Sequence, residues 1–182
     1  MNTLELFEFP DFKGAFASIK QDIADLTSVG FLKKAQSLKI CGDPWFIFSE
    51  AGYRGKFRCF KEGNYNSIPE FQKNISSVRL VKGGLYNPKI TLYEHINYRG
   101  KSFTLDRPTD SLKPYGFDNM VSSHKWVSGA WILYTREYYT GDQMVALAGD
   151  ENPDYRTLGW NDKVSSLKPV LPYEVSIKCE MC

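Results

Sequence analysis

The stretch Tyr93-Glu94-His95-Ile96-Asn97-Tyr98-Arg99-Gly100 has an aromatic residue, four further residues, a second aromatic, one residue and then glycine. The same pattern recurs in three other places: Phe7…Phe12-Lys13-Gly14, Phe48…Tyr53-Arg54-Gly55 and Tyr134…Tyr139-Thr140-Gly141. The four copies begin 41, 45 and 41 residues apart. A regular period of this length indicates one supersecondary unit that is repeated.

A second landmark repeats in step with the first. It is a serine followed by one residue and, in every copy, a lysine or arginine, as in Ser37-Leu38-Lys39, Ser77-Val78-Arg79, Ser123-His124-Lys125 and Ser166-Leu167-Lys168. These serines follow their leading aromatics by 30, 29, 30 and 32 residues. The aromatic-glycine motif and the later serine recur at nearly constant spacing, which predicts four copies of the same unit.

Each unit is predicted to begin with a β-hairpin. Apolar and polar residues alternate before the motif, as in residues 3–8, and again after its glycine, as in residues 101–105. This period of two is typical of half-buried strands. Glycine reaches positive φ without steric cost, so it suits the bend between the two strands. We expect the leading aromatic ring to lie over the folded hairpin.

Long connections follow the hairpins, and they contain Pro69, Pro108, Pro114, Pro153 and Gly159. These residues favour turns with at most short helical stretches. The first connection differs, because Ile19, Ile23, Leu26 and Val29 approximate helical spacing. A hairpin, a long connection and a returning strand make a Greek key.

The four units are predicted to form two domains. Two glycines and a proline lie close together in residues 82–88, between the second and third units, and they indicate a linker. The sequence therefore predicts an all-β chain with domains at 1–82 and 89–170, a linker at 83–88 and a tail at 171–182. Each domain is expected to be a sandwich of two antiparallel sheets.

Composition narrows the class of partner. The chain has 182 residues, a net charge of +2 and charges of both signs throughout, so no basic stripe is present to hold nucleic acid. No apolar run reaches the length of a transmembrane segment, and no signal peptide precedes the first unit. We expect a cytoplasmic protein, with non-classical export open. The cysteines, Cys41, Cys59, Cys179 and Cys182, lack the spacing of a zinc site and favour thiols.

The hairpin motif and the delayed serine, in four copies split two and two, resemble the βγ-crystallin superfamily. The resemblance covers about residues 2–170 and implies two crystallin-type domains. Within the superfamily, the chain is more similar to non-lens members, in particular to the amphibian epidermis differentiation-specific group. In that group a further, aerolysin-like region follows two crystallin domains.

The resemblance implies calcium sites in the second half of the chain. Asp118-Asn119-Met120-Val121-Ser122-Ser123 and Asn161-Asp162-Lys163-Val164-Ser165-Ser166 both match the pattern that marks double-clamp calcium sites in this superfamily. Ca²⁺ prefers hard oxygen ligands, which Asx side chains, hydroxyls and carbonyls supply. We expect each loop to give Asx oxygens and a carbonyl to one ion and its first serine to the other. The predicted ligand residues are Asp118, Asn119, Met120 and Ser165 for one ion, and Asn161, Asp162, Lys163 and Ser122 for the other.

The corresponding stretches of the first half depart from that pattern. Residues 32–37 have lost both Asx positions and the first serine, and they contain Lys33 and Lys34. Residues 72–77 keep their serines but have Gln72 and Lys73 at the Asx positions. We expect the first domain to bind at most traces of calcium.

Two functions remain open. The first is a calcium-binding structural protein, and the second is a binding module that delivers an attached C-terminal region, or a partner subunit, to membranes or glycans. No nucleophile, P-loop or dinucleotide motif occurs, so an enzyme is not expected. In the tail, Tyr173, Val175 and Ile177 alternate as in a new strand, which favours a fragment of a longer protein.

Overall fold

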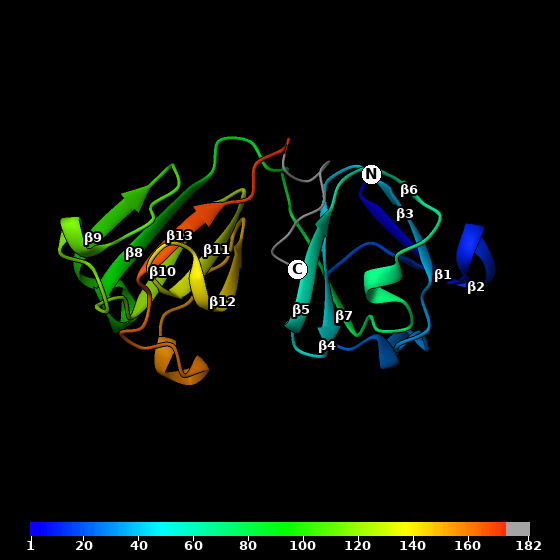
Figure 1. The fold of residues 1–182 in the computed structure, drawn as a ribbon, viewed down its shortest axis with the longest axis horizontal. Coiled ribbons are helices and arrows are strands. Elements are labelled where there is room, and N and C mark those ends of the chain that lie inside the picture. Colours follow the sequence, from blue (N-terminus) through cyan, green and yellow to red (C-terminus); the bar gives the residue numbers. More distant parts are fainter. Residues whose placement is uncertain (174–182) are drawn as a thin grey trace. The chain divides into compact units, whose positions relative to one another are not determined.

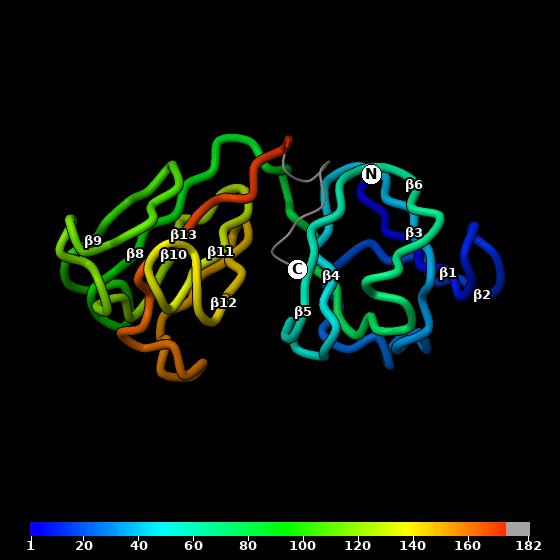
Figure 2. The backbone as a smooth tube through the Cα atoms, in the orientation of Figure 1, coloured from blue at the N-terminus to red at the C-terminus, as the bar shows by residue number. Residues whose placement is uncertain are grey.

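The computed structural model describes residues 1–173 and divides into two units, Met1–Val81 and Lys82–Pro172. Both units are built from strands and short 3₁₀ turns (Figures 1 and 2). The strands of the first are β1 (Thr3–Phe9), β2 (Lys13–Ile19), β3 (Ser37–Cys41), β4 (Trp45–Glu50), β5 (Arg54–Phe60), β6 (Gly63–Tyr65) and β7 (Ser77–Leu80). Those of the second are β8 (Lys89–His95), β9 (Arg99–Leu105), β10 (Ser123–Ser128), β11 (Ala130–Arg136), β12 (Thr140–Leu147) and β13 (Ser166–Pro169). The predicted all-β class is confirmed.

In the first domain, two antiparallel sheets have the strand orders β2-β1-β3-β6 and β5-β4-β7. The strand β6 belongs to the second repeat, yet it pairs with β3 of the first repeat. In return, Ile23 of the first repeat bridges to Val78 of the second repeat's sheet. Each repeat therefore completes the sheet of the other, as two intertwined Greek keys do.

The second domain repeats this arrangement. Its sheets have the orders β10-β8-β9 and β12-β11-β13. Single bridges replace the exchanged strands: His124 pairs with Asn152, and Thr109 pairs with Leu167. The loops that precede β10 and β13 lie next to each other beside these bridges.

Each domain has its own apolar core between its two sheets. Trp45 and Phe71 are fully buried in the first core, and Trp131 and Tyr155 are fully buried in the second. The inward positions come from alternate residues of the strands, such as Leu4 and Leu6 of β1. The alternation read from the sequence thus describes the sheets correctly.

The hairpin motif folds as expected around its glycine. Gly14, Gly55, Gly100 and Gly141 have φ between 77° and 85°. A Cβ on Gly100 would lie 2.7 Å from the His95 ring, so a larger residue would displace that ring as well as strain the backbone. The two aromatics of the motif contact each other; the ring centroids of Tyr93 and Tyr98 are 5.7 Å apart. The second aromatics also have positive φ, which the pattern did not predict.

The repeated serine fastens each hairpin. The Ser123 hydroxyl donates to the carbonyl of His95 at 2.6 Å and accepts the N–H of Tyr98 at 3.2 Å. Ser37, Ser77 and Ser166 make the same pair of bonds in their own repeats. The basic residue two positions later covers the second aromatic ring; the Lys125 ammonium lies 4.4 Å from the Tyr98 centroid. The repeated serine and the basic residue that follows it therefore stabilise the hairpin of each repeat.

The helical elements of the described residues are all short 3₁₀ turns. They are η1 (Pro10–Phe12), η2 (Leu26–Val29), η3 (Pro69–Phe71), η4 (Ile96–Tyr98), η5 (Lys113–Tyr115) and η6 (Tyr155–Leu158). The helical spacing expected from Ile19 to Val29 is wrong. Ile19 ends β2 and Ile23 makes a strand bridge, so only the last turn of that stretch is helical. Within residues 1–173, no helix has the length and apolarity that a membrane crossing requires.

Candidate metal centre

The two loops of the second domain that carry the predicted ligands lie against each other. Residues 118–122 lead into β10, and residues 161–165 lead into β13. The second residue of each loop donates its N–H to the carbonyl of the fourth residue of the other loop, at 3.1 Å in both cases: Asn119 to Val164, and Asp162 to Val121. These two backbone bonds hold the loops as a reciprocal pair.

The second residue of each loop has a left-handed backbone. Asn119 has φ 53° and Asp162 has φ 55°. Asn and Asp tolerate this conformation better than other non-glycine residues. The Asx residues therefore suit the bend, whether or not a metal is bound.

The side chains also cross between the loops. The Ser122 hydroxyl donates to Oδ1 of Asp162 at 3.2 Å, and the Ser165 hydroxyl donates to Oδ1 of Asn119 at 3.3 Å. Both serines are buried. Each serine thus lies beside the Asx residue of the opposite loop, which is the grouping that shared sites require. Their role as calcium ligands stays a prediction.

The first Asx positions differ from each other. Asp118 accepts a bond from Asn119 Nδ2 at its Oδ2, at 3.1 Å, while its Oδ1 is buried and has no hydrogen-bond partner among the described residues. Asn161 donates through Nδ2 to Oδ2 of Asp162 at 2.9 Å. Burying a carboxylate oxygen without a partner costs free energy, and a hard cation would remove that cost. The residues present therefore fit calcium.

Met120 and Lys163 were predicted to contribute only backbone carbonyls. Met120 is half-buried, whereas the Lys163 side chain is exposed. The N–H of Lys163 donates to the carbonyl of Trp160 at 3.2 Å, which fixes the start of its loop. Neither side chain needs to change for a carbonyl to act as a ligand.

An open hollow of about 550 Å³ lies against both loops, and Asn119 and Met120 of the first loop are part of its lining. Ser122, Asn161 and Asp162 line it together with Glu94 and Arg156. Glu94 and Arg156 are not part of the Asx–Ser pattern. Glu94 directly follows the leading aromatic of its repeat, so the motif itself marks its position. Nothing in the sequence marks Arg156, which the exchange between repeats brings there.

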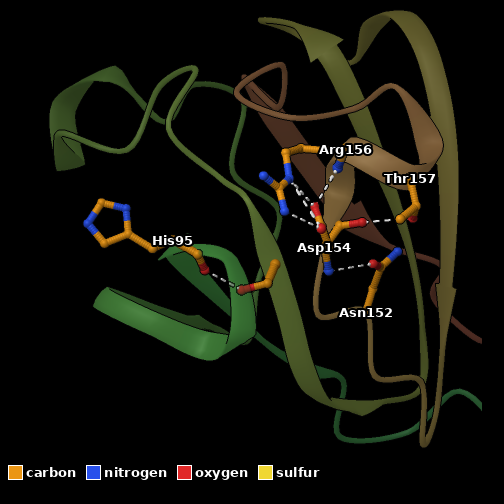
Figure 3. A network of polar contacts seen from close by, with 6 residues as sticks. His95, Asn152, Asp154, Arg156 and Thr157 are labelled. Atoms are coloured by element: carbon orange, nitrogen blue, oxygen red, sulfur yellow. Dashed lines mark hydrogen bonds and ion pairs between the residues drawn. The ribbon is translucent and has the colours of Figure 1, made fainter.

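Arg156 does not present an unbalanced charge to the hollow. Its Nε and Nη2 donate to both oxygens of Asp154 over 2.7–3.2 Å (Figure 3). This ion pair and hydrogen bond lower the pKa of the Asp154 carboxyl. Asp154 also accepts the N–H of Arg156 and thereby caps η6. The local repulsion that a free arginine would exert on a cation is therefore reduced.

The first domain has the same backbone pairing. The N–H of Lys33 donates to the carbonyl of Ile75 at 2.9 Å, and the N–H of Lys73 donates to the carbonyl of Ala35 at 3.0 Å. Lys33 and Lys73 have φ 53° and 51°, as their counterparts do. The loop conformation is therefore conserved between the two domains without Asx residues.

The side chains of the first domain's loops satisfy one another instead. Gln36 takes the position of Ser122; its Nε2 donates to the carbonyl of Glu8 at 2.9 Å, and its Oε1 accepts from Nε2 of Gln72 at 2.8 Å. The Ser76 hydroxyl donates to the carbonyl of Ser49 at 2.8 Å. Amide groups thus bond the oxygens that could otherwise face a cation. This closed network and the two lysines oppose calcium in the first domain.

A buried histidine, His124, lies in β10 just after the first of the two loops. His124 Nδ1 forms a hydrogen bond with the Tyr155 hydroxyl, and its Nε2 has no partner among the described residues. Burial lowers the pKa of His124 to about 4, against a smaller opposing effect of Asp150. The imidazole is therefore neutral at physiological pH.

Residues 1–173 contain no group of three or more His, Cys, Asp or Glu side chains placed to hold a metal ion. Among residues 1–173, neither Cys41, which is exposed, nor Cys59, which is buried, takes part in a disulfide. Cys179, Cys182 and the alternating tail lie outside the described residues. A metal centre in the described part would therefore depend on amide, hydroxyl and carbonyl oxygens as well as carboxylates.

Known proteins are similar to this chain along nearly its whole length. The Beta/Gamma crystallin family matches residues 3–81 and 89–170. An Epidermal differentiation-specific protein from Cynops pyrrhogaster is 35% identical over 97% of this chain and 52% of its own length. Human Beta-crystallin B1 is 30% identical over 81% of this chain and 60% of its own length.

Among solved structures, protein S complexed with calcium is 18% identical over 93% of this chain and 100% of its own, with a TM-score of 0.42. A beta gamma crystallin from Ciona intestinalis is 26% identical over 43% of this chain and 98% of its own, with a TM-score of 0.41. The chain spans only about half to three fifths of the two curated relatives named above.

Proposed function

We propose that this chain, which belongs to the βγ-crystallin family, binds two calcium ions through the paired loops of its second domain and serves as a non-lens structural protein. The family consists of structural and binding proteins, so the chain is not an enzyme, as predicted. The observation that carries the calcium proposal is the reciprocal crossing of Ser122 and Ser165 between the loops, with the Asp118 Oδ1 atom buried and without a hydrogen bond.

Eight residues would hold the two ions. One ion would take Asp118, Asn119, the carbonyl of Met120 and the hydroxyl of Ser165. The other would take Asn161, Asp162, the carbonyl of Lys163 and the hydroxyl of Ser122. Each set has one carboxylate, so the affinity should resemble that of extracellular calcium modules, with dissociation constants of roughly 10⁻⁵–10⁻³ M.

Bound calcium would supply positive charge that holds the oxygens of both loops together. Since each loop contributes to both sets, the ions would join the returning strands of two repeats, β10 and β13. A chain fastened in this way resists local opening, because the loops cannot separate without releasing the ion. Calcium binding is therefore proposed to make the second domain more resistant to local unfolding.

Isothermal titration of the intact chain with calcium tests the proposal. We expect about two ions per chain, and a loss of both from the double variant Asp118→Ala/Asp162→Ala. A matched variant at the first domain's loops, Lys33→Ala/Lys73→Ala, should keep both. If the Asp118→Ala/Asp162→Ala variant gives the same heat of calcium binding as the wild type, the assignment of calcium to these loops is wrong.

A second candidate is a binding module of a larger protein. It is favoured by the similarity to the Cynops pyrrhogaster protein, of which this chain spans only 52%. The resemblance to the epidermal group implies an aerolysin-like, membrane-acting region in such a protein. Mass measurement of the protein from its native source tests this candidate, and a native mass equal to the 20.9 kDa of this chain would refute it.

A further inference from the structure

The second strand of every repeat lies at the edge of its sheet. These strands are β2, β5, β9 and β12. An edge strand presents unpaired backbone N–H and C=O groups, and proteins usually protect such edges with charged side chains. The four repeats therefore offer an internal comparison of one structural position in four contexts.

Three of the four edges carry a charge directly after the motif's glycine. The residues are Lys56 in β5, Lys101 in β9 and Asp142 in β12. In β2 the same position is Ala15, which is exposed. The strand β2, with the sequence Lys-Gly-Ala-Phe-Ala-Ser-Ile, has Lys13 at its start as its sole charge.

The first edge also exposes aromatic rings. Phe16 is 61% exposed, and its counterparts in β9 and β12 are Ser102 and Gln143. Its counterpart in β5, Phe57, is only 6% exposed. Phe9, at the end of β1, is 46% exposed where the other repeats have Glu50, His95 and Arg136. Among the four hairpins, the first alone combines an uncharged residue after the motif's glycine with two exposed phenylalanines.

The Phe16 ring is held in place before any partner arrives. It stacks on Phe7 of the neighbouring strand, with 5.8 Å between ring centroids and 27° between planes. The two residues are directly opposite in the β1–β2 pairing. A ring fixed in this way loses little conformational entropy on association.

An unpaired strand edge favours a polypeptide partner over a lipid one. A strand can satisfy the N–H and C=O groups of β2, whereas hydrocarbon cannot. The sequence of β2 favours β2 of a second copy as the partner strand. Small residues, Gly14-Ala15 and Ala17-Ser18, lie on both sides of Phe16 and leave room for the second Phe16 ring. An antiparallel pairing centred on Phe16 would put Ala15 opposite Ala17.

We propose that β2 pairs antiparallel with β2 of a second copy of this chain. In this register the two Lys13 side chains lie at opposite ends of the interface, so like charges do not face each other. The pairing has two-fold symmetry and occupies the β2 edge of each copy. No β2 edge is then left for a third copy, so the assembly stops at a dimer. A single pair of short strands buries less area than standard stable interfaces, so the dimer should be weak and reversible.

Sedimentation velocity of the intact chain, from micromolar to millimolar concentration, tests the proposal. We expect a monomer–dimer equilibrium in the wild type. The variant Ala15→Lys/Phe16→Ser gives β2 the side chains that β9 has at these positions, and it should weaken dimerisation by at least about tenfold. The converse variant, Lys101→Ala/Ser102→Phe, gives β9 an unprotected edge and should produce species larger than a dimer.

Hydrogen exchange locates the interface. The amides of residues 13–19 should exchange more slowly as the protein concentration rises, while those of residues 99–105 should not change. Both substitutions in β2 are at exposed positions, so circular dichroism should show an unchanged fold.

Three results would overturn the proposal. One is a wild type that stays monomeric at millimolar concentration. Another is a dimer that the β2 variant leaves equally stable. The third is a monomeric wild type that binds phosphatidylcholine vesicles and loses this binding in the variant, which would assign the edge to a lipid surface.

Discussion

The loop pairs of the two domains have the same backbone and opposite side-chain chemistry. In both, the second residue of each loop is left-handed and donates to a carbonyl of the other loop. In the second domain, serine and Asx oxygens then meet across the pair. In the first, Gln36 joins Gln72 and the Glu8 carbonyl in a closed amide network.

This difference teaches that the pairing of the loops belongs to the fold and not to the metal. Backbone bonds between the repeats bring the loops together in either domain. The side chains at a few positions then decide the chemistry between the paired loops. Their oxygens are either available to a cation or occupied by hydrogen bonds within the protein. The fold of the loops therefore does not depend on the side chains proposed to bind calcium.

The largest expected effect is a rise in stability of the second domain with calcium. A ligand at a hundredfold excess over its dissociation constant adds about 2.7 kcal/mol per site, so two sites add about 5 kcal/mol. Hydrogen exchange of the intact chain in millimolar calcium should show this gain in residues 89–170 and none in residues 3–81. Equal gains in both domains would contradict the comparison.

A second difference should appear at acid pH. The His124 pKa is about 4 in the folded chain and 6.5 in its ordinary state, so protonation favours unfolding. Its stabilising contribution is present above pH 6.5 and is lost as the pH falls toward 4, by about 3 kcal/mol. The first domain has Leu38 at this position. Urea unfolding at several pH values, followed for each domain, should show the loss in the second domain alone.

The variant His124→Leu is the control for that experiment. It copies the first domain and should flatten the dependence of the second domain's stability between pH 6.5 and 4. If the variant keeps the wild-type slope, another group is responsible for the acid sensitivity.

The hairpin serines should show no difference between domains. Ser37→Ala and Ser123→Ala each remove a fully buried hydroxyl that donates one bond and accepts another. Each change should destabilise its own domain by about 2 kcal/mol, because buried backbone groups lose their partner. Thermal unfolding measures the loss. A cost confined to the second domain would tie this serine to the calcium site and not to the fold.

The smallest effect should separate the two sites. Ser122→Ala should weaken the ion held by Asn161 and Asp162 by about tenfold, since it removes one neutral oxygen. Ser165→Ala should do the same to the ion held by Asp118 and Asn119. Calorimetric titration with both loops followed by NMR gives the affinities. If Ser122→Ala weakens only the Asp118 site, the sites are local to each loop.

The fold was predictable because its determinants are local and repeated. The glycines after the second aromatics and the alternation of β1 and β9 depend on neighbours in sequence. The role of the repeated serine was not predictable, because its partners, such as the His95 carbonyl for Ser123, lie about 28 residues away. Register with the aromatic motif was the only available signal.

The sequence singled out the two loops that the structure pairs, but not the residues that surround them. The Asx–Ser pattern selected both loops, and the structure brings Ser122 to Asp162 as the shared sites require. Arg156 and the Gln36–Gln72 pair depend on contacts between separate repeats, which no pattern in one sequence contains. The wrong expectation of helical spacing after Ile19 arose for the same reason, because Ile23 pairs with a distant strand.

The most direct test of the central claim is a calcium titration of the intact chain followed by amide NMR shifts. We predict saturable shifts in residues 118–122 and 161–165, with residues 32–36 and 72–76 unchanged. The matched loops share one backbone geometry, so the contrast isolates the side chains. Saturable shifts in both loop pairs, or in neither, would contradict the claim that side chains alone distinguish a calcium site from a closed one.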